Sequence, residues 1–253
     1  MEIAIVTGAS SGLGREYAKL LDEEGLDEIW LVARRQPPLE ELAGELTTKS
    51  CIYALDLTDR ASFLVLQQAL SDSQASVRYL IHAAGFGKMG AAATIPAGVQ
   101  ESMIDLNDRA AVSLVQSVLP HCHTGSHLVQ ICSCAAFLPI PELAVYAATK
   151  AFLLRYSRAL AAELAPQGIL VSAVCPYWVK DTEFITTASQ TDKGRLFRHF
   201  PLAGTKEAIA RRSFQAIKKG RVVITPDGVS TLLRFLSGWI PQDILLHGSR
   251  WFR

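Results

Sequence analysis

Tyr146 and Lys150 are the two residues whose types and spacing most directly suggest chemistry. They are four positions apart in the segment YAATK, and residues at that spacing share one face of a helix. An unperturbed tyrosine has a pKa of about 10, so its phenol is a poor base near neutral pH. A neighbouring ammonium stabilises the phenolate and lowers that pKa, which suits the pair to proton transfer. The YxxxK spacing alone also occurs often by chance.

Ser133 lies thirteen residues before Tyr146 and directly follows an apolar run that predicts a strand over 126–132. Similar runs predict strands over 2–7, 28–33, 51–55, 77–82, 169–175 and 221–224. Helical patterns between them predict helices near 12–24, 39–46, 59–71, 98–122, 146–164 and 205–219. Most of the strands show little polar alternation, as in strands that are covered on both faces. The order predicts an α/β fold with a doubly wound parallel sheet.

The turn after the first predicted strand, TGASSGLG from Thr7 to Gly14, is the candidate anion site. Glycines allow a tight turn and let backbone N–H groups approach a phosphate, and the N-terminus of the following helix adds partial positive charge. The spacing GxxxGxG differs from the GxGxxG of many dinucleotide folds. The alternative is an ordinary glycine-rich turn. In a parallel sheet Ser133 and Tyr146 would lie beside this turn, because ligands bind at the carboxyl ends of the strands.

The end of the second predicted strand, Ala33-Arg34-Arg35, indicates which dinucleotide would bind. A carboxylate about 20 residues beyond the glycine turn binds the ribose 2′-hydroxyl of NAD, whereas Arg accommodates a 2′-phosphate. Arg also offers a planar fork to a phosphate. The sequence therefore favours NADP(H) over NAD(H), with a solvated Arg pair as the alternative. Asp56 could accept a hydrogen bond from the adenine amine or could be a turn residue.

Composition excludes several other classes of protein. Lys and Arg total 25 and Asp and Glu total 24, so the basic excess typical of nucleic-acid binders is missing. No uninterrupted apolar run reaches the length of about 18 residues that a membrane-spanning helix requires. The N-terminal residues lack a basic region and a cleavage site, so we expect no secretory signal. Five unpatterned cysteines predict reduced thiols in a cytoplasmic protein.

Taken together, these motifs resemble the short-chain dehydrogenase/reductase family over about residues 1–182. The glycine turn matches TGxxxGxG, the segment LIHAAG (80–85) resembles the N-A-G motif, and Pro176 with Thr182 resembles the P-G…T segment. The resemblance implies a single Rossmann-type domain over 1–253 and a catalytic tetrad. The tetrad would be Asn107, Ser133, Tyr146 and Lys150. Implied cofactor contacts are Gly8, Ser10, Ser11, Gly12, Leu13, Gly14, Arg34, Arg35, Asp56, Leu57, Ala83, Ala84, Gly85, Tyr146, Lys150, Pro176, Val179 and Thr182.

The family's chemistry is hydride transfer between the nicotinamide C4 and a carbonyl carbon. The resemblance implies that Tyr146 exchanges a proton with the substrate oxygen and that Ser133 hydrogen-bonds the same oxygen. Lys150 would hold the ribose and lower the Tyr146 pKa, and Asn107 would hold a relay water. His82 departs from the family's Asn, with little catalytic effect expected. Tyr177 departs from the Gly after Pro176, which puts the local backbone path in doubt.

An apolar substrate pocket is expected from residues near these groups, although such residues are also often plain core. The candidates are Phe137, Leu143, Trp178 and Phe184, with Leu138 beside them and Phe86 and Met89 as weaker candidates. Residues 176–204 predict a lid over the substrate. A substrate attached to an acyl carrier remains an alternative, because four basic residues lie near the lid: Lys193, Arg195, Arg198 and Lys206. The expected function is therefore NADP(H)-dependent interconversion of a carbonyl and a secondary alcohol on a bulky apolar substrate. The alternatives are a 3-oxoacyl thioester reductase and a catalytically silent dinucleotide sensor.

Two further features favour simple interpretations. His121, His123, His127, Cys132 and Cys134 lack the spacing of structural zinc ligands, so no metal site is predicted; a helix-end His pair and buried thiols are expected instead. The segment 227–253 predicts a helix with Arg234 among apolar residues. It would pack on the domain or on a second subunit of a homodimer or homotetramer. The alternative is contact with a membrane surface.

Overall fold

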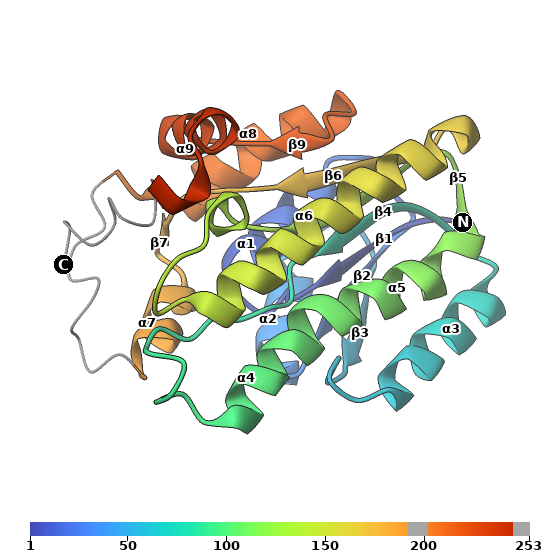
Figure 1. The fold of residues 1–253 in the computed structure, drawn as a ribbon. Coiled ribbons are helices and arrows are strands. Elements are labelled where there is room, and N and C mark those ends of the chain that lie inside the picture. The colour runs from blue at the N-terminus through green and yellow to red at the C-terminus, as the bar shows by residue number, and fades with distance from the viewer. Residues whose placement is uncertain (192–201, 245–253) are drawn as a thin grey trace.

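The computed structural model describes residues 1–191 and 202–244, and its centre is a parallel sheet (Figure 1). The seven strands of this sheet are β1 (Glu2–Thr7), β2 (Glu28–Ala33), β3 (Ser50–Ala54), β4 (Ser76–His82), β5 (Cys122–Ile131), β6 (Leu170–Val174) and β9 (Val223–Ile224). Their order across the sheet is β3-β2-β1-β4-β5-β6-β9, and each neighbouring pair is parallel. The predicted doubly wound Rossmann-type α/β fold is confirmed.

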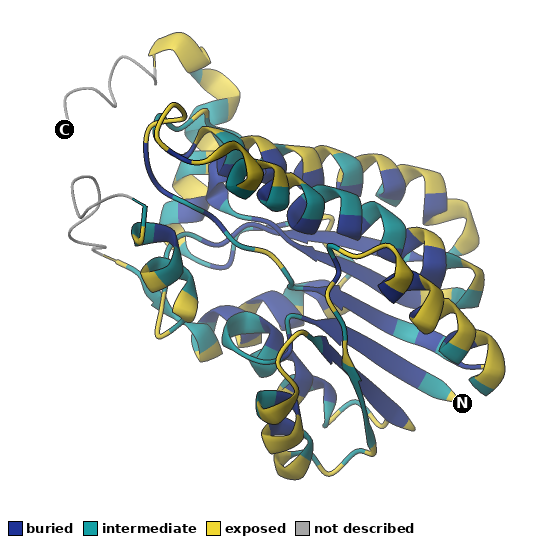
Figure 2. Ribbon diagram, turned by 90° about the horizontal axis from the view of Figure 1, so that it is seen from below, coloured by how far each residue is buried: buried dark blue, intermediate teal, exposed yellow. Residues whose placement is uncertain are grey.

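Helices cover both faces of the sheet, so the strands are buried between two helical layers (Figure 2). The helices are α1 (Gly12–Leu21), α2 (Gln36–Glu45), α3 (Ala61–Ser73), α4 (Ala97–Ile104), α5 (Ala110–Val118), α6 (Ala144–Leu164), α7 (Glu183–Ser189), α8 (Lys206–Lys218) and α9 (Gly228–Trp239). Alternate strand residues serve the two layers: Ile3 and Ile5 pack toward α3, α5 and α6, and Ala4 and Val6 pack toward α1, α2 and α8. This double burial explains the continuous apolar strands of the sequence. No helix among residues 1–191 and 202–244 has the length and apolar character that a membrane crossing requires.

The helix predicted over 98–122 is wrong in detail. A π-helical turn, η1 (Asp105–Arg109), separates α4 from α5, and a short 3₁₀ turn at Leu119–His121 precedes β5. Pro120 favours this stop, since its ring cannot continue an α-helix. Cys122 and His123 therefore begin a strand and do not end a helix.

The stretch 176–204, predicted as one irregular lid, contains short regular elements. β7 (Val179–Lys180) pairs with β8 (Gly204–Thr205) in a second, parallel sheet, and α7 lies between them in sequence. Lys88 holds α7 by donating from Nζ to the Thr187 carbonyl at 2.7 Å and to Gln190 Oε1 at 2.7 Å. Lys193, Arg195 and Arg198 lie outside the described residues.

Candidate functional site

A cleft of about 590 Å³ opens at the carboxyl ends of the parallel strands. The glycine turn after β1 and the tip of β2 line one end, and Ser133, Tyr146 and Lys150 line the other. The cleft lies where the chain order reverses, with β2 on one side of β1 and β4 on the other. The structure therefore brings the two predicted groups of site residues into a single cavity.

The glycine turn is shaped for close approach. Gly8 and Gly12 have φ of 67° and 57°, a region that glycine adopts readily. A Cβ on Gly14 would lie 2.3 Å from the Gly8 carbonyl oxygen, so α1 can begin here only with glycine. Ser11, at the N-cap of α1, makes no side-chain cap hydrogen bond. The first N–H groups of the helix can therefore serve a phosphate, which is the fit that a dinucleotide requires.

The two arginines at the tip of β2 differ in their ion-pair contacts. Arg34 is exposed and lines the cleft. Arg35 also lines the cleft, and its guanidinium pairs with Glu183 of α7 at 2.8 Å. Leu57 lines the cleft as predicted, but Asp56 is not among the lining residues. Asp56 instead accepts hydrogen bonds from the Thr58 N–H at 2.9 Å and hydroxyl at 2.8 Å, as a turn residue does.

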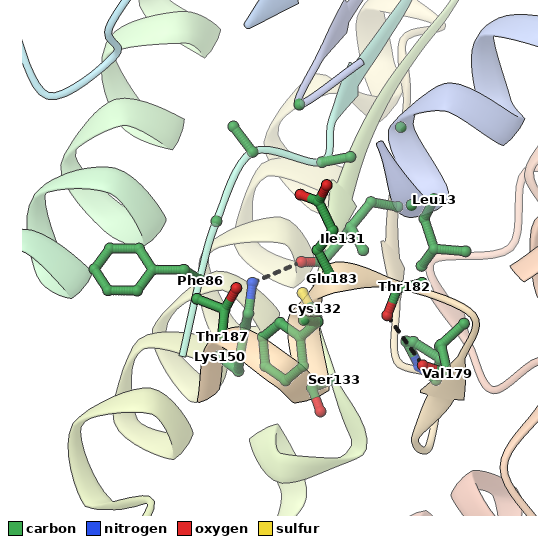
Figure 3. A pocket seen from close by; sticks show the side chains of 18 of the residues that line it. Leu13, Phe86, Ile131, Cys132, Ser133, Lys150, Val179, Thr182, Glu183 and Thr187 are labelled. Atoms are coloured by element: carbon green, nitrogen blue, oxygen red, sulfur yellow. Dashed lines mark hydrogen bonds between the residues drawn. The ribbon is translucent and has the colours of Figure 1, made fainter. Parts of the chain in front are cut away.

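Ser133, Tyr146 and Lys150 meet at the other end. Ser133 caps the 3₁₀ turn Cys134–Phe137, with Oγ accepting from the Ala135 N–H at 3.1 Å, and its hydroxyl is close enough to the Tyr146 phenol to lower the pKa of that phenol. Lys150 Nζ lies 5.7 Å from the centroid of the Tyr146 ring, which places the ammonium and phenol on one face of α6. Figure 3 shows the Lys150 ammonium donating to the Ile131 carbonyl, at 2.9 Å.

The pKa of Tyr146 is raised, whereas the sequence predicts that Lys150 lowers it. Burial raises the pKa of this phenol well above its usual value, and the neighbouring Ser133 hydroxyl only partly opposes that effect. Lys150 is equally buried, which lowers its own pKa, and its ammonium is engaged by a backbone carbonyl. The phenol is therefore protonated at neutral pH in the free protein.

Asn107 is completely buried inside η1 and spans three elements. Its amide donates to the Phe86 carbonyl and to the Thr149 hydroxyl, each at 3.0 Å, and its Oδ1 accepts from the Phe86 N–H at 3.1 Å. Gly85 permits this packing, because a Cβ there would lie 2.8 Å from Asn107 Oδ1. Asn107 does not line the cleft but fixes the segment that does.

His82, which stands where the family usually has Asn, hydrogen-bonds the end of β1. Its Nδ1 lies 2.9 Å from the Thr7 hydroxyl, and that hydroxyl also accepts from the Ala84 N–H at 3.2 Å. Burial, reinforced by the charge of Lys150, lowers the His82 pKa to about 3, so the ring is neutral. His82 therefore joins the ends of β1 and β4 beside the glycine turn.

Asp108 should make stability depend on pH. Its Oδ1 is buried without a hydrogen-bond partner, and burial raises its pKa to about 7 despite the opposing charge of Lys150. The unfolded carboxyl ionises near pH 4, so Asp108 costs stability progressively as pH rises from about 4 to about 7. We expect the melting temperature of Asp108→Asn, relative to wild type, to increase between pH 5 and pH 8.

Comparing the two proteins cancels the opposite slope from His82, which gains stability as pH rises from about 3 to about 6.5. If the difference in melting temperature between Asp108→Asn and wild type stays constant from pH 5 to pH 8, Asp108 is ionised in the folded protein throughout that interval.

The Tyr146 end of the cleft is apolar. The Phe184 ring lies 5.3 Å from that of Tyr146 and 6.3 Å from that of Trp178, and Leu143 is buried beside them. Three of the four predicted pocket residues, Leu143, Trp178 and Phe184, line the cleft, and so does Leu138. Phe137 lies elsewhere, in the wall of a second cavity beside α6.

Tyr177 follows Pro176 without left-handed backbone. Its N–H donates to Asp227 Oδ2 at 2.9 Å, and its side chain lines the cleft. The chain therefore accommodates a side chain where the family has glycine.

Sequence reasoning did not identify Gly87, Glu183 and Leu233 as site residues. A Cβ on Gly87 would lie 2.8 Å from the Tyr146 ring, and this glycine was visible only as the third residue of a GFG run. Leu233 brings α9 to the cleft, as expected of a helix packed on the domain. Phe235 and Trp239 of the same helix are exposed. No sequence pattern marks Glu183 as a site residue, because its role depends on α7 folding back beside Arg35 at the end of β2.

Within residues 1–191 and 202–244, no group of three or more His, Cys, Asp and Glu side chains could hold a metal ion. Cys134 is buried beside Ser133, and burial raises the pKa of its thiol to about 12. Such a thiol stays protonated and is a poor nucleophile.

Comparisons with known proteins agree with this geometry. Residues 2–193 match the family model described as short chain dehydrogenase. An uncharacterized oxidoreductase of Staphylococcus epidermidis is 30% identical over 177 residues, which cover 69% of this chain and 76% of that protein. A very-long-chain 3-oxoacyl-CoA reductase of Lodderomyces elongisporus is 35% identical over 198 residues, covering 70% of this chain and 54% of that protein.

Among solved structures, a short-chain dehydrogenase from Sphingobium yanoikuyae in complex with NADPH is 27% identical. Its TM-score is 0.78, with 96% of this chain and 97% of that chain covered. The family match spans well over half of the sequence and includes the glycine turn and the segment from Ser133 to Lys150. The chain therefore belongs to the short-chain dehydrogenase family.

Proposed function

We propose that the protein is an NADP(H)-dependent oxidoreductase that interconverts a carbonyl and a secondary alcohol on a bulky apolar substrate. One observation carries the proposal: Ser133, Tyr146 and Lys150 converge at the apolar end of a cleft whose other end holds the glycine turn and Arg34. A bound nicotinamide dinucleotide supplies or accepts the hydride. We further propose a cytoplasmic, homo-oligomeric protein with one domain over 1–253, as the sequence predicts.

The residues of the chain have separable roles in this proposal. Tyr146 donates its phenolic proton to the carbonyl oxygen, and Ser133 hydrogen-bonds the same oxygen and stabilises its developing charge. The phenol is protonated in the free protein, which is the form that carbonyl reduction requires. Lys150 binds the ribose and supports the negative charge that remains when the proton leaves. Phe184, Trp178 and Leu143 exclude water and contact apolar substrate groups.

The direct test is a panel of aromatic, steroid-like and acyl-chain ketones monitored by NADPH absorbance, with NADH in parallel. We expect turnover with NADPH and a preference for bulky apolar ketones over small ones. Tight dinucleotide binding with no turnover across the panel would favour the dinucleotide sensor. A clear preference for NADH would contradict the role of Arg34 and leave the catalytic assignment in place.

Arg34→Ala should change the cofactor preference. Arg34 is an exposed cation at the β2 tip that lines the cleft, and although its charge helps to lower the pKa of Asp56, that carboxylate is held by Thr58, so the guanidinium can bind a 2′-phosphate. A hydrogen bond to a charged group contributes about 1.5–3 kcal/mol, so the Kd for NADPH should rise about tenfold or more. The Kd for NADH should change less than twofold. Dissociation constants from protein fluorescence test this, and an equal loss for both dinucleotides would contradict it.

A 3-oxoacyl thioester reductase is the second candidate. The relative from Lodderomyces elongisporus, named a very-long-chain 3-oxoacyl-CoA reductase, supports an acyl substrate. Lys206, one of the four basic residues expected at its entrance, pairs with Glu16 at 3.3 Å. Including a 3-oxoacyl-CoA beside the free ketones in the panel separates the two candidates.

A further inference from the structure

A carboxylate from the lid lies among the groups that would bind the phosphates of the cofactor. Glu183 is the first residue of α7, and it lines the same cleft as Ser11 and Arg35. Figure 3 shows its carboxylate in the cavity together with Leu13 of the glycine turn and Thr182. It is the one acidic residue among the residues that line the cleft in the described part of the chain.

Glu183 uses both oxygens to join two elements that are far apart in sequence. Arg35 donates to Glu183 Oε1 at 3.2 Å and to Oε2 at 2.8 Å, and the Ser11 hydroxyl donates to Oε2 at 3.3 Å. Arg35 follows β2, and Ser11 is the N-cap of α1. A fork from Arg and a hydroxyl at a helix N-terminus are the donors that usually bind a phosphate oxygen.

The preceding residue places Glu183 there. Thr182 lies over the glycine turn, so close that a Cβ on Gly12 would be 3.6 Å from Thr182 Cγ2. The Thr182 hydroxyl donates to the Val179 carbonyl at 3.1 Å, which closes a turn, and Asp181 has φ of 63°. The folded backbone thus places Glu183 beside the glycine turn, where its exposed side chain reaches Arg35 and Ser11.

We propose that Glu183 is a specificity-determining residue that competes with the cofactor phosphates for Arg35 and Ser11. The inference rests on the proposed NADP(H) function. In the free protein Glu183 holds these donors, and binding of the dinucleotide must release them. Because only the released state can bind phosphate with both donors, the apparent affinity falls by the fraction of protein in that state. The competition also links cofactor binding to the position of α7, since the ion pair ties this helix to β2.

Glu183→Gln should tighten NADPH binding. The amide retains the size of the side chain but removes the negative charge that holds Arg35. An exposed ion pair contributes up to about 1 kcal/mol, which corresponds to a Kd lower by about two- to fivefold. The gain should be smaller for NADH, which has no 2′-phosphate for Arg35 to bind. Fluorescence titration at low ionic strength measures both constants.

A double-mutant cycle that combines Glu183→Gln with Arg35→Gln measures how much of the change in NADPH affinity comes from the Glu183–Arg35 ion pair. The gain from Glu183→Gln should be much smaller when Arg35 is already replaced, because only the Ser11 hydroxyl then remains to be released. The matched control is Glu41→Gln, which removes a carboxylate paired with Arg15 at 2.9 Å outside the cleft. It should leave both dissociation constants unchanged. A gain of equal size in the Arg35→Gln background, or no gain at all, would overturn the proposal.

A second measurement needs no cofactor. Without the Arg35 contact, α7 should open more often, so trypsin should cleave after Lys180 faster in Glu183→Gln than in wild type or Glu41→Gln. Equal cleavage rates would contradict the tie between α7 and β2. Failure of every protein to bind either dinucleotide would instead overturn the proposed function, and the competition with it.

Discussion

Tyr146→Phe should reduce kcat by about 10²- to 10⁴-fold, the usual contribution of a positioned general acid. The substitution removes the phenolic oxygen and leaves the ring in place against Phe184. Because the ring is buried and its packing is kept, the fold should survive. NADPH binding should change little, since the glycine turn and Arg34 lie at the other end of the cleft.

The measurement is single-turnover reduction of the best ketone from the panel, with NADPH affinity and the melting temperature determined on the same preparation. Phe184→Leu is the matched control, because it alters the apolar wall beside Tyr146 without touching a proton donor. It should change KM for bulky ketones more than kcat. A rate near that of wild type for Tyr146→Phe would show that another group is the acid.

Gly14→Ala should both destabilise the fold and weaken dinucleotide binding. The added methyl would lie 2.3 Å from the Gly8 oxygen and 2.7 Å from the Gly8 carbonyl carbon, so backbone must move. Such overpacking costs about 1–3 kcal/mol. The displaced atoms belong to the turn that faces the phosphates, and a shift of about 1 Å in a positioning element can cost a hundredfold in function. We expect the Kd for NADPH to rise at least about tenfold.

Gly44→Ala provides the control for this substitution. Gly44 lies in α2, and no other atom comes within 4 Å of a Cβ placed there. Alanine should stabilise that helix by about 0.5–1 kcal/mol and leave NADPH binding unchanged. Thermal denaturation and fluorescence titration distinguish the two variants, and a Gly14→Ala protein with normal affinity would show that the turn does not bind the cofactor.

The sheet was predictable because its signals are local. Each parallel strand is covered on both faces, so it appears as a short apolar run, and the seven predicted strands differ from the observed ones mainly at their ends. The convergence of Ser133 and Tyr146 follows from the rule that ligands lie at the carboxyl ends of parallel strands. Only the direction of the chain and the order of the elements were needed for that inference.

What could not be predicted depends on contacts between distant residues. The raised Tyr146 pKa follows from burial of the phenol, which no i, i+4 spacing reports. Glu183 meets Arg35 across 148 positions of sequence. No residue composition marks the π-helical turn at Asp105–Arg109 in the sequence. Its conformation is held by the hydrogen bonds of Asn107 to Phe86 and Thr149. In each case tertiary structure decides between options that the local sequence permits.

The π-helical turn also bears on how this helix tolerates changes in length. Its i to i+5 path holds one more residue than an α-helix between the same ends. A chain shortened by one residue between Ile104 and Ala110 could run on as a regular helix, with α4 and α5 still packed as before. Asn107 would then leave Phe86. The fold would accept such a deletion, but the segment at Phe86 that lines the cleft would lose its hydrogen bonds to Asn107.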